Sequence, residues 1–167
     1  MSVFIPNLIL KDVTCINEKL LKEHNIKGLI LDVDNTLAKH GSQELSLHIS
    51  DWLDEMKKLD VKLMVVSNNN KKRVEPFAQK LGLDFVSMAL KPMTYGFCKA
   101  KKIFNFENNE IAVVGDQIYT DITGGNLKGM FTILVTPFTL ENNFFFKLKR
   151  KLENIHINNY NKRNGVK

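Results

Sequence analysis

Short apolar segments that alternate with helical patterns constrain the fold of this 167-residue chain more than any other feature. The apolar segments are rich in Val, Ile and Leu, and the stretches between them carry apolar residues at helical spacing. Near-continuous apolar strands in such an alternation are typical of a parallel sheet that helices cover on both faces. We therefore predict a three-layer α/β/α fold whose five parallel strands lie at residues 28–33, 61–66, 84–88, 111–115 and 131–135.

The helical patterns between these strands have clear apolar faces. The strongest spans residues 45–59 and includes Trp52, and a second spans residues 74–81 with a glycine directly after its end. A third covers about residues 94–104. We interpret Trp52 and most of the phenylalanines as core residues, because they fall on these apolar faces.

Positive charge is concentrated at the C-terminus. The formal net charge of +6 is confined to residues 147–167, where seven Lys and Arg residues stand against Glu153 alone. Apolar residues at helical spacing from Phe144 to Ile155 predict a basic amphipathic helix, which either packs on the sheet with its charges in water or contacts anionic lipid. We expect no ordered structure in the last dozen residues. We therefore divide the chain into a globular domain, 1–143, and a basic helix and tail, 144–167.

The composition excludes several classes of protein. No segment approaches the length of apolar chain that a transmembrane helix needs, and residues 1–6 lack the features of a secretory signal. Cys15 and Cys98 are isolated, which favours free thiols in a reducing compartment. These features predict a cytoplasmic protein, with peripheral contact at the membrane surface as the accompanying alternative.

Two carboxylates follow the first predicted strand directly. Asp32 and Asp34 are two residues apart, so on a strand they point the same way and repel each other. Parallel sheets bind ligands at the carboxyl ends of their strands. A divalent cation together with a phosphate group would remove the repulsion, so this pair predicts a phosphate-handling site.

Polar residues also follow the other predicted strands. Ser67 follows the second strand, Lys91 the third and Asp116 the fourth, with Asp121 five residues later. Each alone is explained as a turn, a helix cap or a solvated charge. Because all of them fall at the carboxyl edge of one sheet, we predict that they converge on one pocket.

The order Asp-x-Asp-x-Thr, Ser, Lys-Pro and Gly-Asp-x4-Asp resembles the motifs of the haloacid dehalogenase-like (HAD) superfamily of phosphohydrolases, over about residues 26–136. The contexts of Asp34, Ser67, Lys91 and Asp116 are similar to the YqeG branch of subfamily IIIA, which is related to phosphatidylglycerophosphate (PGP) phosphatases. The resemblance implies a Rossmann-like, HAD-like domain. The intervals between the motifs have room only for a helix and a strand, so we expect no cap domain.

The resemblance also implies a role for each residue of the motifs. Asp32 would attack phosphorus to form an aspartyl-phosphate, and Asp34 would protonate the leaving oxygen and then activate water. Asp32, the backbone carbonyl of Asp34 and Asp116 would hold Mg²⁺. Asp121 would orient Lys91 or a metal-bound water, with Asn126 as a more distant support. The transferring phosphoryl group would bind to Ser67 and Lys91 and to backbone amides near Asn35 and Asn68.

An uncapped site suits a phosphate on a large or surface-bound molecule. The resemblance to PGP phosphatases implies that this molecule is PGP, so the leading interpretation is its dephosphorylation to phosphatidylglycerol. A soluble sugar or nucleotide phosphate is the main alternative, and a nucleic-acid-binding module or a scaffold with a dormant site is less favoured. Leu127 stands where the family commonly has arginine, and the C-terminal part lacks the usual Arg-containing pattern of the family. These departures concern recognition of the substrate head group.

Overall fold

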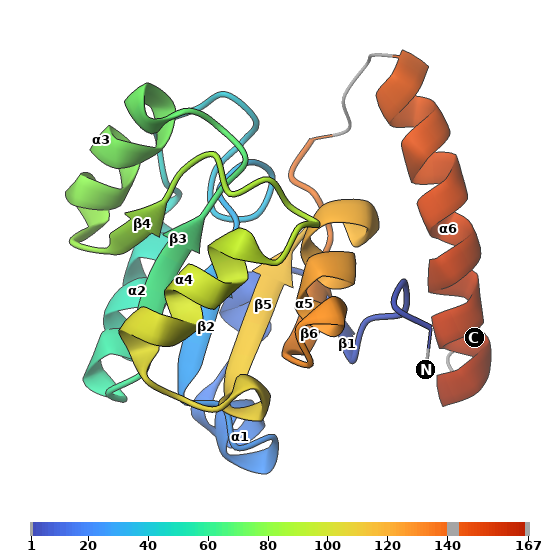
Figure 1. The fold of residues 1–167 in the computed structure, drawn as a ribbon, viewed down its shortest axis with the longest axis horizontal. Helices are drawn as coiled ribbons and strands as arrows, with labels where there is room; N and C mark the ends of the chain where they lie inside the picture. The colour runs from blue at the N-terminus through green and yellow to red at the C-terminus, as the bar shows by residue number, and fades with distance from the viewer. Residues whose placement is uncertain (1, 140–143, 166–167) are drawn as a thin grey trace.

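Six parallel strands form a single sheet in the computed structural model of the chain, in which residues 2–139 and 144–165 are described (Figure 1). The strand order is β1-β6-β5-β2-β3-β4. The five predicted strands are confirmed, and the sixth is an edge strand, β1, that pairs with β6. Its three residues are too few to give a strand pattern in the sequence. The strands are β1 (Leu8–Leu10), β2 (Gly28–Leu31), β3 (Lys62–Val66), β4 (Asp84–Val86), β5 (Ile111–Gly115) and β6 (Phe131–Val135).

Helices cover both faces of the sheet, which confirms the three-layer prediction (Figure 1). One face packs against α2 and α3, and the other packs against α4. Trp52 of α2 is buried, and its indole N–H donates to the carbonyl of Ile16 at 2.8 Å. The helices are α1 (Glu18–Glu23), α2 (Leu47–Lys58), α3 (Lys71–Leu81), α4 (Tyr95–Phe104), α5 (Thr123–Leu127) and α6 (Phe144–Asn164), with short 3₁₀ turns at Val13–Cys15 and Asn108–Glu110 and one π-helical turn, η3 (Ile118–Ile122).

The topology brings the polar strand ends together. β2 lies between β5 and β3, so residues that follow these three strands emerge side by side at the carboxyl edge. The described chain between β2 and β3 consists of a loop and α2, and between β3 and β5 it consists of α3, β4, α4 and a 3₁₀ turn. No domain is inserted in either described interval, as the sequence predicted.

The C-terminal helix α6 is longer than predicted (Figure 1). It continues to Asn164, so it includes residues 156–164, for which we expected no order. Ile157 explains part of this extension, because it packs against a small apolar cluster that includes Ile118 and Leu134. The proposed domain boundary falls at residues 140–143, which lie outside the described chain.

The predicted apolar face of α6 is exposed rather than packed on the sheet. Leu148, Leu152 and Ile155 are 47%, 44% and 55% exposed, and the side chains of Phe144 and Phe145 lie outside the description. The helix instead contacts the domain through a different side that includes Glu153 and Ile157. Among the residues that the structure describes, none of the helices has the length and hydropathy of a membrane-spanning segment.

Candidate active site

Lys91 lies at the centre of the site. Its ammonium donates to Oδ1 of Asp32 at 2.6 Å, to Oδ1 of Asp121 at 2.6 Å and to the carbonyl of Val66 at 2.9 Å. Burial alone would lower the pKa of Lys91, but the carboxylates of Asp121 and Asp32 raise it above its usual value. A buried lysine with three acceptors is therefore held in its charged form next to Asp32.

The segment after β4 places this lysine by alternating its side chains. Ala89 and Lys91 point inward and are buried, whereas Met88 and Leu90 point outward and are exposed. The side chain of Asn68 brackets the lysine backbone, because its Oδ1 accepts from Lys91 N at 2.6 Å and its Nδ2 donates to Lys91 O at 3.0 Å. Asn68, which we expected near the phosphate, thus fixes the position of Lys91.

Asp34 has different surroundings from Asp32. Its Oδ1 accepts from Gly41 N at 2.8 Å and from Nη2 of Arg73 at 3.0 Å, and its Oδ2 accepts from Nδ2 of Asn69 at 2.5 Å. These donors come from the loop after β2, from the loop after β3 and from the first turn of α3. Two carboxylates that are neighbours on the chain are therefore held by separate sets of donors, one around a lysine and one around an arginine.

Asp116 and Asp121 complete an acidic cluster with Asp32. One carboxylate oxygen from each of the three buried residues lies within 4.8 Å of the other two. Gly115 makes this possible, because a β-carbon there would lie 2.3 Å from Cγ of Asp121. Asp121 lies in the π-helical turn η3, a local geometry that is frequent at functional sites.

The acidic cluster fits a divalent cation. Burial raises the pKa of Asp116 to about 8 and that of Asp32 to about 6, and the mutual repulsion of the carboxylates contributes to both. Among the described residues, Oδ1 of Asp116 is buried without a hydrogen-bond partner. An oxygen-only donor set with one buried unpaired carboxylate oxygen suits a hard cation such as Mg²⁺.

Ser67 and Asn35 form part of the turns beside the acids. The hydroxyl of buried Ser67 accepts from Asn69 N at 3.2 Å, so it keeps its own proton for donation to another acceptor. Asn35 has a positive φ of 62°, and its N–H donates to Ala38 O at 2.7 Å. Its side-chain oxygen accepts from both N and Oγ1 of Thr139. The structure therefore places Asn35 in the loop that shapes the site.

Asn126 lies away from these contacts. Its Nδ2 donates to the carbonyls of Val3 and Ile5 at 2.8 and 2.9 Å, and its Oδ1 accepts from the Thr132 hydroxyl at 3.0 Å. The side chain thus ties the N-terminal segment to β6. None of its described hydrogen bonds reaches the acidic cluster, because the side chain points from α5 toward the N-terminal segment.

Two arginines that we did not predict contact acidic residues of the site. Arg73 contacts Asp34, and Arg150 of α6 donates through Nη2 to the carboxylate of Asp116 and through Nη1 to its backbone carbonyl at 2.6 Å. Arg73 stands in a run of basic residues and Arg150 in the basic tail, so both give the sequence signal of solvated charges. An arginine of the C-terminal part is therefore present at the site, although the expected family pattern is absent.

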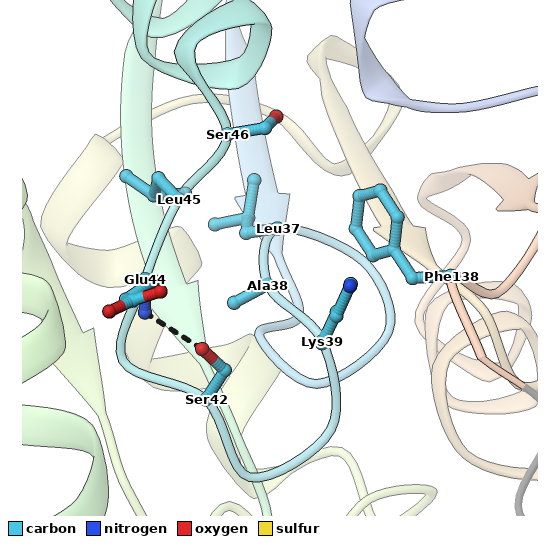
Figure 2. Close-up of a pocket in the computed structure, with 8 residues that line it drawn as sticks. All are labelled: Leu37, Ala38, Lys39, Ser42, Glu44, Leu45, Ser46 and Phe138. Carbon is cyan, nitrogen blue, oxygen red and sulfur yellow. Dashed lines mark hydrogen bonds between the residues drawn. The ribbon is translucent and has the colours of Figure 1, made fainter.

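A hollow of about 260 Å³ lies beside the loop that carries Asp34 (Figure 2). Leu37 and Phe138 lie on different sides of it, and the Lys39 side chain extends toward Phe138 (Figure 2). The loop itself is closed by bridges from Ala38 to Asp34 and to Leu45. The hollow is lined by Leu37, Ala38, Lys39, Ser42, Glu44, Leu45, Ser46 and Phe138.

Solved structures similar to this chain share its fold. An uncharacterized protein from Listeria monocytogenes serotype 4b has a TM-score of 0.58 and 18% identity, with 71% of this chain and 85% of that chain covered. The cobalt-bound deoxy-D-mannose-octulosonate 8-phosphate phosphatase from Haemophilus influenzae has a TM-score of 0.51 and 16% identity, with 84% and 92% covered.

Sequence relatives give the family. Residues 1–138 match the family described as mitochondrial PGP phosphatase. The probable phosphatase YqeG of Bacillus subtilis (strain 168) is 37% identical over 150 residues, which cover 90% of this chain and 87% of that protein. The chloroplastic/mitochondrial phosphatidylglycerophosphate phosphatase 1 of Arabidopsis thaliana is 24% identical over 159 residues, which cover 89% of this chain but only 46% of that protein. The chain belongs to the mitochondrial PGP phosphatase family and is a phosphatase that acts on a phosphorylated substrate.

Proposed function

We propose that this phosphatase is Mg²⁺-dependent, works through an aspartyl-phosphate on Asp32 and converts PGP to phosphatidylglycerol. One observation carries the chemistry: Asp32 lies 2.6 Å from the Lys91 ammonium and within the acidic cluster, while Asp34 is held apart by Arg73 and Asn69. This separation supports different roles for the two carboxylates.

The first half-reaction transfers the phosphoryl group to the protein. A carboxylate oxygen of Asp32 forms a bond to phosphorus, the ester P–O bond breaks, and Asp34 gives a proton to the leaving oxygen. The Ser67 hydroxyl and the Lys91 ammonium would donate to the phosphoryl oxygens, where negative charge is spread in the transition state. Lys91 would then exchange one of its present acceptors for the phosphoryl group.

The second half-reaction releases phosphate. Water attacks phosphorus, Asp34 takes its proton, and the bond between phosphorus and the Asp32 oxygen breaks. Inorganic phosphate leaves, Asp32 is again a carboxylate, and Asp34 is again protonated for the next substrate. A carboxyl that changes protonation state is needed for this cycle, and Asp34 is the described candidate outside the acidic cluster.

The cofactor is proposed from the donor set. Asp32, Asp116 and the backbone carbonyl of Asp34 would hold Mg²⁺, supported by the buried unpaired Oδ1 of Asp116. When bound, the cation supplies positive charge that offsets the repulsion between the carboxylates and a phosphate dianion and polarises a phosphoryl oxygen.

A lipid substrate is favoured by exposed apolar side chains at the rim of the site. Met88, Leu90 and Met93 are 60%, 58% and 65% exposed and flank buried Lys91 on the chain. Met88 and Leu90 also have positive φ values of 48° and 56°, a conformation that costs free energy in residues of this type. Clustered exposed apolar residues commonly mark a contact surface. A bilayer that carries the phosphate in its head-group region is the contact that suits this rim.

The exposed stripe on α6 supports the same substrate. Leu148, Leu152 and Ile155 recur at helical spacing, and exposed Lys147 and Lys151 lie next to them in sequence. Apolar residues beside lysines are typical of a helix that lies in the interface of an anionic membrane. The hollow in Figure 2 offers apolar side chains such as Leu37 and Phe138 for the part of the substrate beyond the phosphate.

The substrate is tested with a soluble ester and a lipid in parallel. We expect wild-type protein to hydrolyse p-nitrophenyl phosphate and PGP in vesicles, both with Mg²⁺. The variant Leu148→Ser/Leu152→Ser/Ile155→Ser should keep p-nitrophenyl phosphate turnover but lose most vesicle turnover. Leu47→Ser/Ile103→Ser, at exposed apolar residues of α2 and α4, is the control and should keep both activities. Efficient turnover of a sugar phosphate with none of PGP vesicles would overturn the lipid assignment.

A further inference from the structure

The C-terminal helix grips the loop that follows β5. Arg150 donates to both the carboxylate and the backbone carbonyl of Asp116, Lys149 donates to the side-chain oxygen of Gln117, and Oε1 of Glu153 accepts from Ile118 N at 2.8 Å. Three neighbouring α6 residues thus contact three consecutive loop residues. This degree of contact is more than a tethered membrane anchor requires.

Arg150 occupies one carboxylate oxygen of Asp116 and leaves the other. Its Nη2 contacts Oδ2, whereas Oδ1 is buried without a partner among the described residues. One oxygen of each acid in the cluster lies within 4.8 Å of the others. A guanidinium that fixes Oδ2 also fixes the direction in which Oδ1 points, because the carboxylate is planar.

Glu153 compensates the charge that Arg150 brings. Its Oε2 accepts from Nη1 of Arg150 at 2.9 Å, and both side chains are largely buried. A lone guanidinium beside a cation site would repel the cation. Paired with Glu153, Arg150 can orient Asp116 without adding net positive charge to the site.

From these contacts we propose that Arg150 and Glu153 are positioning residues, which orient Asp116 so that its Oδ1 is available to the divalent cation. The inference rests on the proposed function, since it concerns the same cation. It makes α6 part of the catalytic domain. The exposed apolar side of this helix would contact the membrane, and the buried side with Arg150 and Glu153 would position Asp116.

Cation binding is measured directly with Mn²⁺, by the loss of the free-ion electron paramagnetic resonance signal on titration of full-length protein. Arg150→Met should weaken Mn²⁺ binding about 10-fold or more, which is the usual effect of removing a group that orients a metal ligand. Glu153→Gln should also weaken it, because it leaves the arginine charge uncompensated. Arg150→Lys should bind Mn²⁺ more tightly than Arg150→Met, since it keeps an N–H donor for Oδ2 of Asp116.

The matched control is Arg163→Met, the same change at an exposed position on α6, which should bind Mn²⁺ as wild type does. Circular dichroism shows whether each variant is folded. Wild-type Mn²⁺ affinity in a folded Arg150→Met variant, or an equal loss in Arg163→Met, would overturn the role of Arg150 while leaving the proposed function intact. Failure of wild-type protein to bind Mn²⁺ or Mg²⁺ would overturn the proposed cofactor and this inference together.

Discussion

Nζ of Lys91 lies 2.6 Å from Oδ1 of Asp32 and equally close to Oδ1 of Asp121, so one ammonium joins two acids of the cluster. Both acids need a positive partner, because burial makes an isolated carboxylate costly. The lysine therefore offsets part of the negative charge of the cluster before substrate arrives. In the proposed mechanism it also donates a hydrogen bond to the transferred phosphoryl group.

Asp121→Asn tests whether Asp121 serves Lys91 or the cation. We expect kcat for p-nitrophenyl phosphate to fall about 10- to 100-fold, because misplaced catalytic groups lose rate steeply. Mn²⁺ affinity should stay close to that of wild type, because Asp121 is expected to hold Lys91 rather than to ligate the cation. A large loss of Mn²⁺ affinity would instead assign Asp121 as a direct ligand.

Arg73→Met tests how Asp34 is held. Arg73 donates from Nη2 to Asp34 and to the Ser42 carbonyl, at 3.0 and 2.6 Å, so it fixes the acid to the loop. A poorly placed acid matters most for leaving groups that need a proton. We expect a much larger loss of kcat with an alkyl phosphate than with p-nitrophenyl phosphate. Equal losses with both esters would mean that Arg73 does not act through Asp34, and Lys72→Met at the exposed neighbouring position is the control.

Stability should depend on pH through the two raised pKa values. The pKa of Asp32 rises from 3.8 to about 6 and that of Asp116 from 3.8 to about 8, so the folded metal-free protein binds more protons than the unfolded chain between these limits. Its stability should therefore fall as pH rises from about 4 to about 8. Mg²⁺ should raise Tm more at the higher pH, where the acids are ionised. Thermal unfolding of wild type and Asp116→Asn checks this, and a pH slope that is the same in both would contradict it.

Asn126→Ala tests the placement of Asn126 outside the site. Its amide bonds to the carbonyls of Val3 and Ile5 would be lost, so we expect a loss of about 1–3 kcal/mol in the free energy of unfolding. The kcat of the folded variant should stay near wild type. Denaturant unfolding measures the first quantity, and a strong loss of kcat at unchanged stability would return Asn126 to the site.

The sequence is sufficient to predict five of the six strands and the order of the acids, because both depend on local pattern. Apolar runs such as Ile111–Gly115 are recognisable as buried strands from the sequence alone. In a parallel sheet with this strand order, the residues that follow β5, β2 and β3 meet at one edge. Edge strand β1 escaped prediction for a physical reason. Its three residues become a strand only by pairing with β6, whose position is fixed by the whole fold.

The arginines could not be predicted, because their partners are far away in sequence. Arg73 meets an acid 39 residues earlier and Arg150 an acid 34 residues earlier, and no spacing rule connects either pair. The side of α6 that contacts the domain could not be predicted either. Its apolar residues suggest a buried side through Leu152, whereas Arg150 and Glu153 on another side make the contacts with the domain.

The most direct test of the central claim is to trap the aspartyl-phosphate. Asp34→Asn lacks the group that activates water, and p-nitrophenolate leaves without needing a proton, so radiolabelled p-nitrophenyl phosphate should load the variant with phosphate that is released slowly. After acid quenching and digestion, we expect the label on the peptide that contains Asp32 and no label in Asp32→Asn/Asp34→Asn. Label on a different side chain, or no protein label although wild type hydrolyses the ester, would contradict Asp32 as the nucleophile.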